Sequence, residues 1–241
     1  MNISLRLSKI VDIIAECDTL ADIGCDHGYV GISALNKGKA CRVTAADVAK
    51  GPLAAARKNS IEEGVSDRID FVLSDGFKDI PDDERLECAV IAGMGGLLMK
   101  RILYEGSLER FKGLKQLILS PQSDLDAVRK YLVEELGMNI VCEYVIKDEG
   151  KYYFIFDVAA DDRKDESYSD AEYVYGKHIA EESIDTYREF LGHRKKILTD
   201  ALSAVSGEES ERKRQRSTEL KRELALLEEA LSFHGKSGPI K

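Results

Sequence analysis

Residues 22–31 read DIGCDHGYVG and follow the short apolar run TLA, which is typical of the end of a β-strand. Gly24 and Gly28 let the backbone turn tightly beneath a ligand. Counted from Gly24, a dinucleotide-binding turn would also need glycine at Asp26 and Tyr29, so NAD or FAD is a poor fit. No lysine followed by serine or threonine closes the turn, which excludes a phosphate-binding P-loop.

Acidic side chains accompany this turn and the two strands predicted after it. Asp22 and Asp26 place negative charge around a ligand, which would repel a pyrophosphate and suit an amino group or a sulfonium cation. S-adenosyl-L-methionine carries both. Asp47 ends the second predicted strand, where a carboxylate can accept hydrogen bonds from both hydroxyls of a ribose. Asp75 ends the third strand and can accept from an adenine amino group.

The fourth predicted strand ends in IAGMGG, residues 91–96, where three glycines leave space beside a reactive methyl group. All these positions lie at the carboxyl ends of predicted parallel strands, where open α/β sheets bind ligands. One acid at a strand end is often only a cap. The four features together and in this order, namely the acidic glycine turn, Asp47, Asp75 and the IAGMGG turn, favour a class I methyltransferase. The predicted cofactor-binding residues are Asp22, Gly24, Cys25, Asp26, His27, Gly28, Asp47, Val48, Asp75, Gly76, Ala92, Gly93 and Met94.

Helix-like and strand-like segments alternate over residues 4–136, which predicts an α/β fold with a doubly wound parallel sheet. Ser123 is the predicted N-cap of the last helix in this series. Residues 139–158 differ, because two β-rich runs are separated only by a short turn at residues 148–150. That pattern predicts an antiparallel hairpin at the end of the sheet, which an ordinary dinucleotide-binding half does not need.

The composition changes at residues 159–170, AADDRKDESYSD, which are strongly charged. We expect a domain boundary there, with a Rossmann-like domain over residues 1–160 and a helical domain over residues 161–241. In the second part, apolar residues recur at steps of four and three along residues 187–205 and 220–231. Two such stripes joined by a short polar turn predict an antiparallel coiled-coil hairpin of two α-helices.

The gross composition excludes several classes of protein. The 241 residues carry a formal net charge of −9, which argues weakly against a general nucleic-acid coat protein. Arg6, Lys9 and Asp12 interrupt the N-terminal apolar stretch, so we expect neither a signal peptide nor a membrane span, and a cytoplasmic location. The five cysteines form no C-x-x-C pair, and Cys25 is expected to be a passive thiol. No His/Cys/Asp cluster has metal-ligand spacing, so no metal is expected.

Motifs over residues 1–158 resemble the bacterial tRNA (adenine-22-N1)-methyltransferases. The N-terminal helix, ADIGCDHGYV, AADV, LSDGF, IAGMGG, LSPQSD and EGKYYFI carry the resemblance, and DIGCDHGY and AGMGG are its specific parts. It implies a Rossmann-like class I methyltransferase sheet, a C-terminal coiled-coil domain, S-adenosyl-L-methionine as methyl donor and N1 of a tRNA adenine as acceptor. The family usually has alanine where this chain has Gly28, an exchange of small residues that we expect to matter little.

Asp26 and Tyr29 are the predicted catalytic residues. Adenine N1 already has a lone pair, so the enzyme must mainly hold it in line with the methyl group and stabilise the positive charge that appears on the ring. The turn from Ala92 to Gly95 lacks the asparagine and the aromatic residue with which amino-methyltransferases grip an exocyclic amine. Tyr29 would stack on, or hydrogen-bond to, the acceptor base. The alternatives are that Tyr29 only packs on the first helix of the fold and that Asp26 only caps it.

The charge balance reverses over residues 192–222, which contain nine Lys or Arg residues against five Asp or Glu. Two basic runs on facing helices would contact the tRNA phosphates, although a single run such as RKK usually marks a solvated helix face. We expect no obligate protein partner, but the heptads would also suit dimerisation. The predicted RNA-binding residues are Arg194, Lys195, Lys196, Arg212, Lys213 and Arg214.

Two other functions remain open from the sequence alone. One is a class I methyltransferase that acts on another RNA or on a small molecule, for which the helical hairpin would be dispensable. The other is a non-catalytic tRNA-binding protein that uses the nucleotide only for structure, which would bind tRNA without forming a product.

Overall fold

The computed structural model describes residues 3–81, 85–106, 111, 113–159, 167–205 and 210–234. The chain forms two compact units, Met1–Glu166 and Ser167–Lys241. The predicted boundary at residues 160–161 lies outside the described residues.

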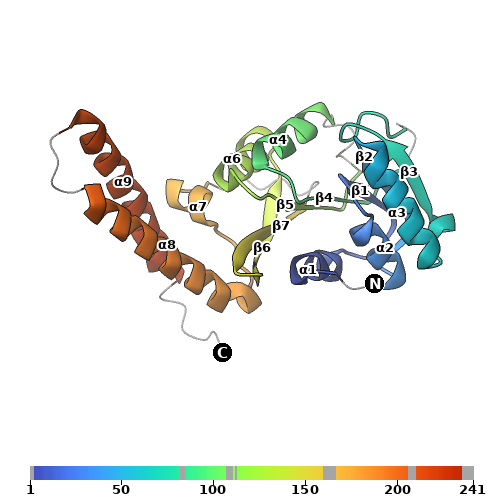
Figure 1. The fold of residues 1–241 in the computed structure, drawn as a ribbon, viewed down its shortest axis with the longest axis horizontal. Helices are drawn as coiled ribbons and strands as arrows, with labels where there is room; N and C mark the ends of the chain where they lie inside the picture. Colours follow the sequence, from blue (N-terminus) through green and yellow to red (C-terminus); the bar gives the residue numbers. More distant parts are fainter. Residues whose placement is uncertain are drawn as a thin grey trace. The chain divides into compact units, whose positions relative to one another are not determined.

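The first unit is built on a seven-stranded sheet with the order β3-β2-β1-β4-β5-β7-β6 (Figure 1). β1 to β5 pair in parallel, whereas β7 runs antiparallel to both β5 and β6. The predicted parallel sheet with a terminal antiparallel hairpin is confirmed. The strands are β1 (Cys17–Ile23), β2 (Ala40–Asp47), β3 (Ile69–Leu73), β4 (Cys88–Ala92), β5 (Gln116–Ser120), β6 (Asn139–Asp148) and β7 (Lys151–Ala159).

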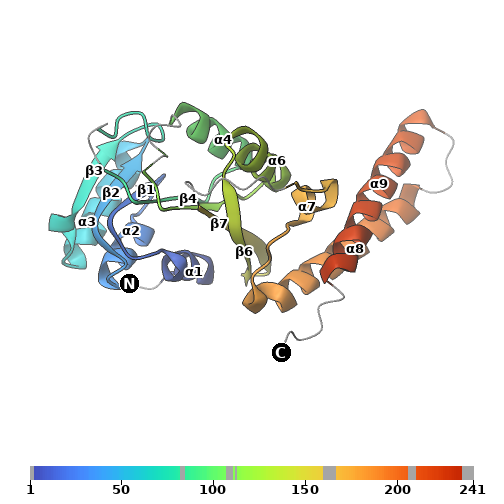
Figure 2. The same ribbon diagram turned by 180° about the vertical axis from the view of Figure 1, so that it is seen from behind.

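Helices cover both faces of this sheet (Figures 1 and 2). The connections from β1 and β2 run toward the β3 edge, and the connection from β4 runs toward β5, so right-handed crossovers place their helices on opposite faces. A π-helical turn (Tyr131–Glu135) follows directly on the helix of residues 125–130, and a 3₁₀ turn (Ser66–Arg68) precedes β3. The helices are α1 (Leu5–Ile13), α2 (Tyr29–Asn36) and α3 (Lys50–Glu62) on one face, and α4 (Gly96–Glu105) and α6 (Leu125–Lys130) on the other.

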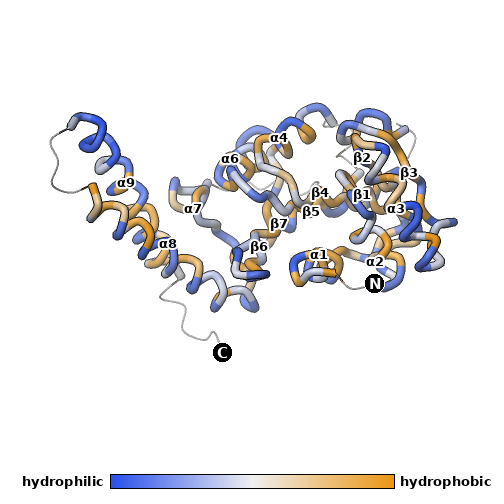
Figure 3. Tube along the Cα trace, in the orientation of Figure 1, coloured by the Kyte–Doolittle hydropathy of each residue, from blue (hydrophilic) through white to orange (hydrophobic). Residues whose placement is uncertain are grey.

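The core lies where the central strands meet α1. Leu20, Val90 and Ile118 come from three adjacent strands and are buried together with Ile10 and Ile155. Because helices cover both faces, the inner parallel strands are continuous apolar runs, and β4 and β5 are coloured hydrophobic along most of their length in Figure 3.

Two turns show how local sequence sets the backbone. Glu149 and Gly150 join β6 to β7 with φ angles of 48° and 78°, the left-handed pair that a two-residue hairpin turn requires. The prediction that Ser123 caps α6 is wrong. Asp124 precedes the helix with a φ of 53°, and the Ser123 hydroxyl donates to the Asp124 carboxylate at 2.6 Å instead of capping a backbone amide.

The second unit contains α7 (Asp170–Tyr175), a 3₁₀ turn (Glu181–Ser183), α8 (Ile184–Val205) and α9 (Glu211–His234). α8 and α9 lie side by side in both views (Figures 1 and 2). The turn of the predicted hairpin, residues 206–209, lies outside the described residues. The buried positions fall on the stripes expected from the sequence and include Tyr187, Leu191, Leu198, Leu220 and Leu227.

Helical structure was expected beyond residue 170, but α7, which begins at the last residue of the charged segment 159–170, was not predicted as a separate helix. The local signal was a capping box, in which the Ser169 hydroxyl accepts from the Glu172 amide and the Glu172 carboxylate accepts from the Ser169 amide. This capping box therefore sets the start of α7 at the last residue of the charged segment.

A buried ion pair anchors the terminal hairpin to the rest of the first unit. Arg129 of α6 donates from Nε and Nη2 to Oε2 of Glu143 on β6, at 2.9 and 2.8 Å, and both side chains are fully buried. The Arg129 guanidinium also lies over the rings of Phe156 and Phe154, at 4.8 and 5.5 Å from their centroids. Loss of either charge would leave the other buried without its counter-ion.

We predict that Glu143→Gln lowers the free energy of unfolding by about 3–5 kcal/mol, because it removes the buried carboxylate charge that faces the buried Arg129 guanidinium. Urea titration followed by circular dichroism measures this. The double variant Arg129→Met/Glu143→Leu should recover most of the loss, and Lys58→Gln, which breaks an exposed pair with Glu62, should leave the midpoint unchanged. A Glu143→Gln midpoint equal to that of the wild type would contradict the assignment.

Candidate functional site

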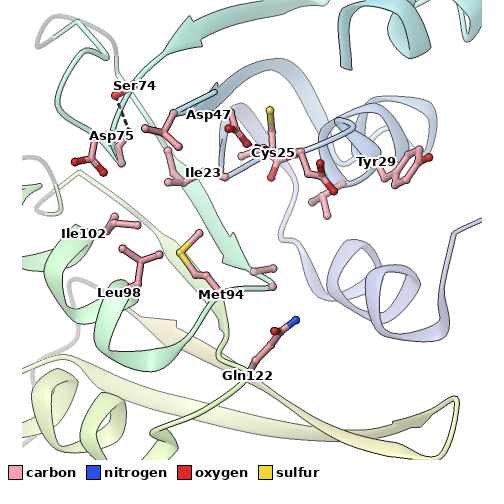
Figure 4. Close-up of a pocket in the computed structure, with 18 of the residues that line it drawn as sticks. Ile23, Cys25, Tyr29, Asp47, Ser74, Asp75, Met94, Leu98, Ile102 and Gln122 are labelled. Carbon is pink, nitrogen blue, oxygen red and sulfur yellow. Dashed lines mark hydrogen bonds between the residues drawn. The ribbon is translucent and has the colours of Figure 1, made fainter. Parts of the chain in front are cut away.

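A cavity of about 610 Å³ opens at the carboxyl ends of the parallel strands (Figure 4). β1 and β4 are neighbours, but the chain leaves them toward opposite edges of the sheet, which creates the crevice where such folds bind ligands. Met94, Leu98 and Ile102 lie across the cavity from Asp47 and Cys25 (Figure 4). The size and the mixed lining suit a small molecule that has both apolar and polar parts.

The glycine turn after β1 forms one wall, and three of its residues have left-handed backbone. The φ angles are 70° at Gly24, 50° at Asp26 and 73° at Gly28. A Cβ on Gly24 would lie 2.7 Å from the Met94 methyl carbon, and one on Gly28 would lie 2.9 Å from Cβ of Ala56 in α3. An alanine at position 28 of this chain would therefore need Ala56 to move, although the departure from the family's usual alanine leaves the resemblance intact.

Asp22 is buried beneath the turn, where its Oδ2 accepts the backbone N–H of Gly31 in α2 at 3.0 Å. Burial raises its pKa to about 6, and the nearby Asp47 charge adds to the rise. Because the folded state holds this proton more tightly than the unfolded chain, the carboxyl destabilises the fold increasingly as the pH rises from about 4 to 6. A cation placed beside Asp22 would relieve that cost.

The Asp47 carboxylate at the end of β2 connects two loops. Its Oδ2 accepts from the Asp26 amide at 3.1 Å, and its Oδ1 accepts from the Ala49 amide at 2.9 Å. These bonds fix the orientation of the carboxylate. Each oxygen retains a lone pair for a further donor on the cavity side.

Asp75, after β3, is held by two cations that the sequence analysis did not predict. Arg101 of α4 donates to both carboxylate oxygens at 2.9 and 2.8 Å, and Lys78 donates to Oδ2 at 3.2 Å. The Arg101 hydrogen bonds are the main reason why the pKa of Asp75 lies below its usual value. Any ligand amine that contacts Asp75 shares the carboxylate with Arg101.

Eleven of the predicted cofactor residues line the cavity, and His27 and Gly28 do not. His27 stacks outward on the Tyr29 ring, with the centroids 5.4 Å apart and the planes 16° from parallel. Cys25 lines the cavity but is buried, and burial raises the pKa of its thiol, so it carries no thiolate.

Asp26 and Tyr29, the predicted catalytic pair, both line the cavity. The Asp26 side chain is 71% exposed. Gly28 is the residue that precedes α2, and no side chain caps that helix, so Asp26 is not its cap. Tyr29 is the first residue of α2, and its side chain lies at one side of the lining, beyond Cys25 (Figure 4).

Arg6 of α1 is a cavity residue that the sequence analysis did not assign to the site. Its guanidinium lies over the Tyr153 ring at 5.1 Å and beside Gly93, whose added Cβ would lie 3.7 Å from both Nη atoms. Nη1 is buried and has no hydrogen-bond partner among the described residues. The signal was its spacing, because Arg6 stands four residues before Ile10 on the buried stripe of the helix.

The predicted RNA-binding residues are distributed along α8 and α9. Arg194 Nε donates to Glu223 Oε1 at 3.1 Å, and Lys195 Nζ lies 3.6 Å from Glu228 Oε1, so both form ion pairs between the helices. Lys196 is exposed. With Arg194 opposite Glu223, the run at residues 212–214 lies roughly 15 Å further along the helix pair, so the two basic runs are separate rather than adjacent.

No group of three or more His, Cys, Asp or Glu side chains in the described part of the chain is placed to hold a metal ion. Within the same residues, no helix has the length and the apolar character needed to span a membrane.

Comparisons with known proteins agree with this architecture. A model of the family described as tRNA (adenine(22)-N(1))-methyltransferase, TrmK, matches residues 20–229. The Bacillus subtilis (strain 168) tRNA (adenine(22)-N(1))-methyltransferase is 28% identical over 243 residues, which cover 98% of this chain and 99% of that protein.

Two solved structures extend the match to the fold. The crystal structure of the B. subtilis enzyme superposes with a TM-score of 0.79 and 26% identity, covering 95% of this chain and 98% of that one. The Streptococcus pneumoniae protein Sp1610 in complex with S-adenosyl-L-methionine gives a TM-score of 0.82 and 26% identity, covering 95% and 100%. The resemblance seen in the sequence motifs is confirmed, and this chain belongs to the tRNA (adenine(22)-N(1))-methyltransferase family.

Proposed function

We propose that this chain binds S-adenosyl-L-methionine in the cavity at the strand ends and methylates N1 of adenine 22 in tRNA, in the cytoplasm. The observation that carries the proposal is the lining of that cavity in a chain of this family. Its walls combine the carboxylates of Asp22, Asp26 and Asp47 with apolar side chains. Such a lining suits a cationic nucleoside and disfavours a nucleotide with phosphates.

The donor would bind through three kinds of contact. Asp47, oriented by two backbone amides, would accept from the ribose hydroxyls, and Asp22 would face the amino group. Val48, which is 71% exposed, and Leu98 would enclose the adenine ring between apolar surfaces. Asp75 would accept from the adenine amine while it remains bonded to Arg101, because its two oxygens offer about four lone-pair sites.

The acceptor base would approach over Asp26 and Tyr29. When bound, S-adenosyl-L-methionine supplies a methyl group on sulfur, and its transfer forms the N1–C bond, breaks the S–C bond and moves the positive charge to the adenine ring. The Asp26 carboxylate would stabilise that developing charge. Tyr29 would stack on the base and hold N1 in line with the methyl group.

We propose that the helical domain, residues 161–241, supplies much of the tRNA affinity. Arg212 and Arg214 are exposed in the first turn of α9, and Lys196 is exposed on α8, so these three cations are better placed for phosphates than Arg194 and Lys195, which form ion pairs with acids of α9. Extruding adenine 22 from the tRNA costs on the order of a few kcal/mol, which these contacts would offset.

The direct test is nucleoside mass spectrometry of unmodified tRNA incubated with the protein and S-adenosyl-L-methionine. We expect 1-methyladenosine in a tRNA with adenine 22 and none in the same tRNA with guanine 22. Methylation of both tRNAs would show that adenine 22 is not the methylated position. If the protein binds the donor but methylates neither tRNA, tRNA is not its substrate.

Asp26→Asn and Tyr29→Ala are expected to lower kcat by about 10²-fold or more at saturating donor and tRNA, with unchanged circular dichroism. Asparagine tolerates the left-handed φ of 50° at position 26, so Asp26→Asn isolates the loss of charge. Tyr29→Phe is the matched control for stacking, and it should retain most of the activity if the ring rather than the hydroxyl matters. Wild-type rates in Asp26→Asn and Tyr29→Ala would refute the assignment.

The triple variant Arg212→Gln/Lys213→Gln/Arg214→Gln is expected to raise the KM for tRNA about tenfold, with unchanged kcat and donor affinity. It should also reduce the slope of log K for tRNA against log salt by about 2, because three phosphate contacts are lost. Lys37→Gln/Arg42→Gln/Lys58→Gln removes the same charge from exposed pairs of the first unit and serves as the control. Equal KM values in the two variants would rule out a specific role for α9.

A further inference from the structure

Arg6 is a charged group in the cavity with an unused donor. Its backbone N–H donates to Oδ2 of Asp148 at 3.3 Å, and its guanidinium packs over Tyr153, so both ends of the β6–β7 hairpin turn help to position it. The structure nevertheless leaves Nη1 buried without a hydrogen-bond partner among the described residues. A buried, unsatisfied guanidinium nitrogen is costly, which makes an absent anionic partner the natural explanation.

Charge in the cavity narrows the identity of that partner. Arg101 is the other arginine in the lining, and Asp75 already accepts from both of its terminal nitrogens. Burial lowers the pKa of Arg6 from its usual value, although Tyr153 and the Asp148 carboxylate act in the opposite direction. A ligand that fits the acids elsewhere in the cavity and also carries one anion would satisfy Arg6.

S-adenosyl-L-methionine carries one such anion, its α-carboxylate. We propose that Arg6 binds this carboxylate, an inference that rests on the proposed function. The donor's amino group would then face Asp22 and its carboxylate would face α1, so the two charges of the amino acid are recognised by opposite charges on different elements. Arg6 lies beside Gly93, which has no side chain to separate the guanidinium from the ligand.

A tRNA phosphate is a poorer occupant of this position. The Nη1 atom is buried, and the guanidinium lies between the Tyr153 ring and the β4 glycine turn. A polyanionic backbone would have to enter the cavity past Asp22, Asp26 and Asp47 to reach it. A single carboxylate on a ligand that already occupies the cavity meets no such barrier.

Isothermal titration with two ligands tests the proposal without turnover. S-adenosyl-L-homocysteine has the carboxylate, and its decarboxylated analogue keeps the amine, the ribose and the adenine. We expect the wild type to bind the first roughly 10- to 100-fold more tightly than the second. In Arg6→Gln the two affinities should come within about threefold of each other, because only the carboxylate contact is lost.

Two further variants make the result specific. Lys9→Gln removes a cation from the same helix, where Lys9 lies over the Tyr144 ring at 4.2 Å outside the cavity lining, and it should keep the wild-type preference. Arg6→Lys should keep part of the preference, and it provides the measurement if Arg6→Gln does not fold. A wild-type preference in both Arg6 variants would overturn the proposal, whereas a wild type that binds neither ligand would overturn the proposed function itself.

Discussion

The site depends on one topological constraint, the position of β1 between β2 and β4. All three strands run in parallel, yet the chain leaves β1 toward one edge of the sheet and β4 toward the other. No helix can cover the gap between those two departures, so the carboxyl ends of the strands stay open. The glycine turn enters this gap, and the Asp47 carboxylate ties it to β2 through the Asp26 amide. The loops that follow β1, β2 and β4 therefore bring residues from separate parts of the chain together in the cavity.

Several features at this opening lower the stability of the folded chain when no ligand is bound. Asp22 is buried with a raised pKa, Asp26 has a left-handed backbone, and Nη1 of Arg6 finds no hydrogen-bond acceptor in the described part of the chain. Each of these features costs free energy in the folded chain, and such costs gather at functional sites. Away from the opening, the buried charges of Arg129 and Glu143 are paired with each other.

The sequence alone predicted the strands, the hairpin and most of the cavity lining, because these follow from apolar periodicity and from acids and glycines at strand ends. It did not place Arg6 or Arg101 in the cavity lining, because each lies on a helix that reaches the cavity from another part of the chain. α7 was not predicted as a separate helix because its capping box involves only residues 169–172, whereas the composition was judged over a longer segment. The separation of the two basic runs was missed, since it depends on the register between α8 and α9.

The hydrogen bond from the Arg6 amide to Asp148 joins residues 142 positions apart in the chain. Gln116 likewise accepts from the Ala15 amide and donates to the Ile13 carbonyl, which ties the end of α1 to β5. During synthesis, α1 emerges first but finds these partners only after β5 and the hairpin have left the ribosome. The wall of the cavity that α1 forms is therefore completed last, and a nascent chain that stops before β7 has its donor site open on one side.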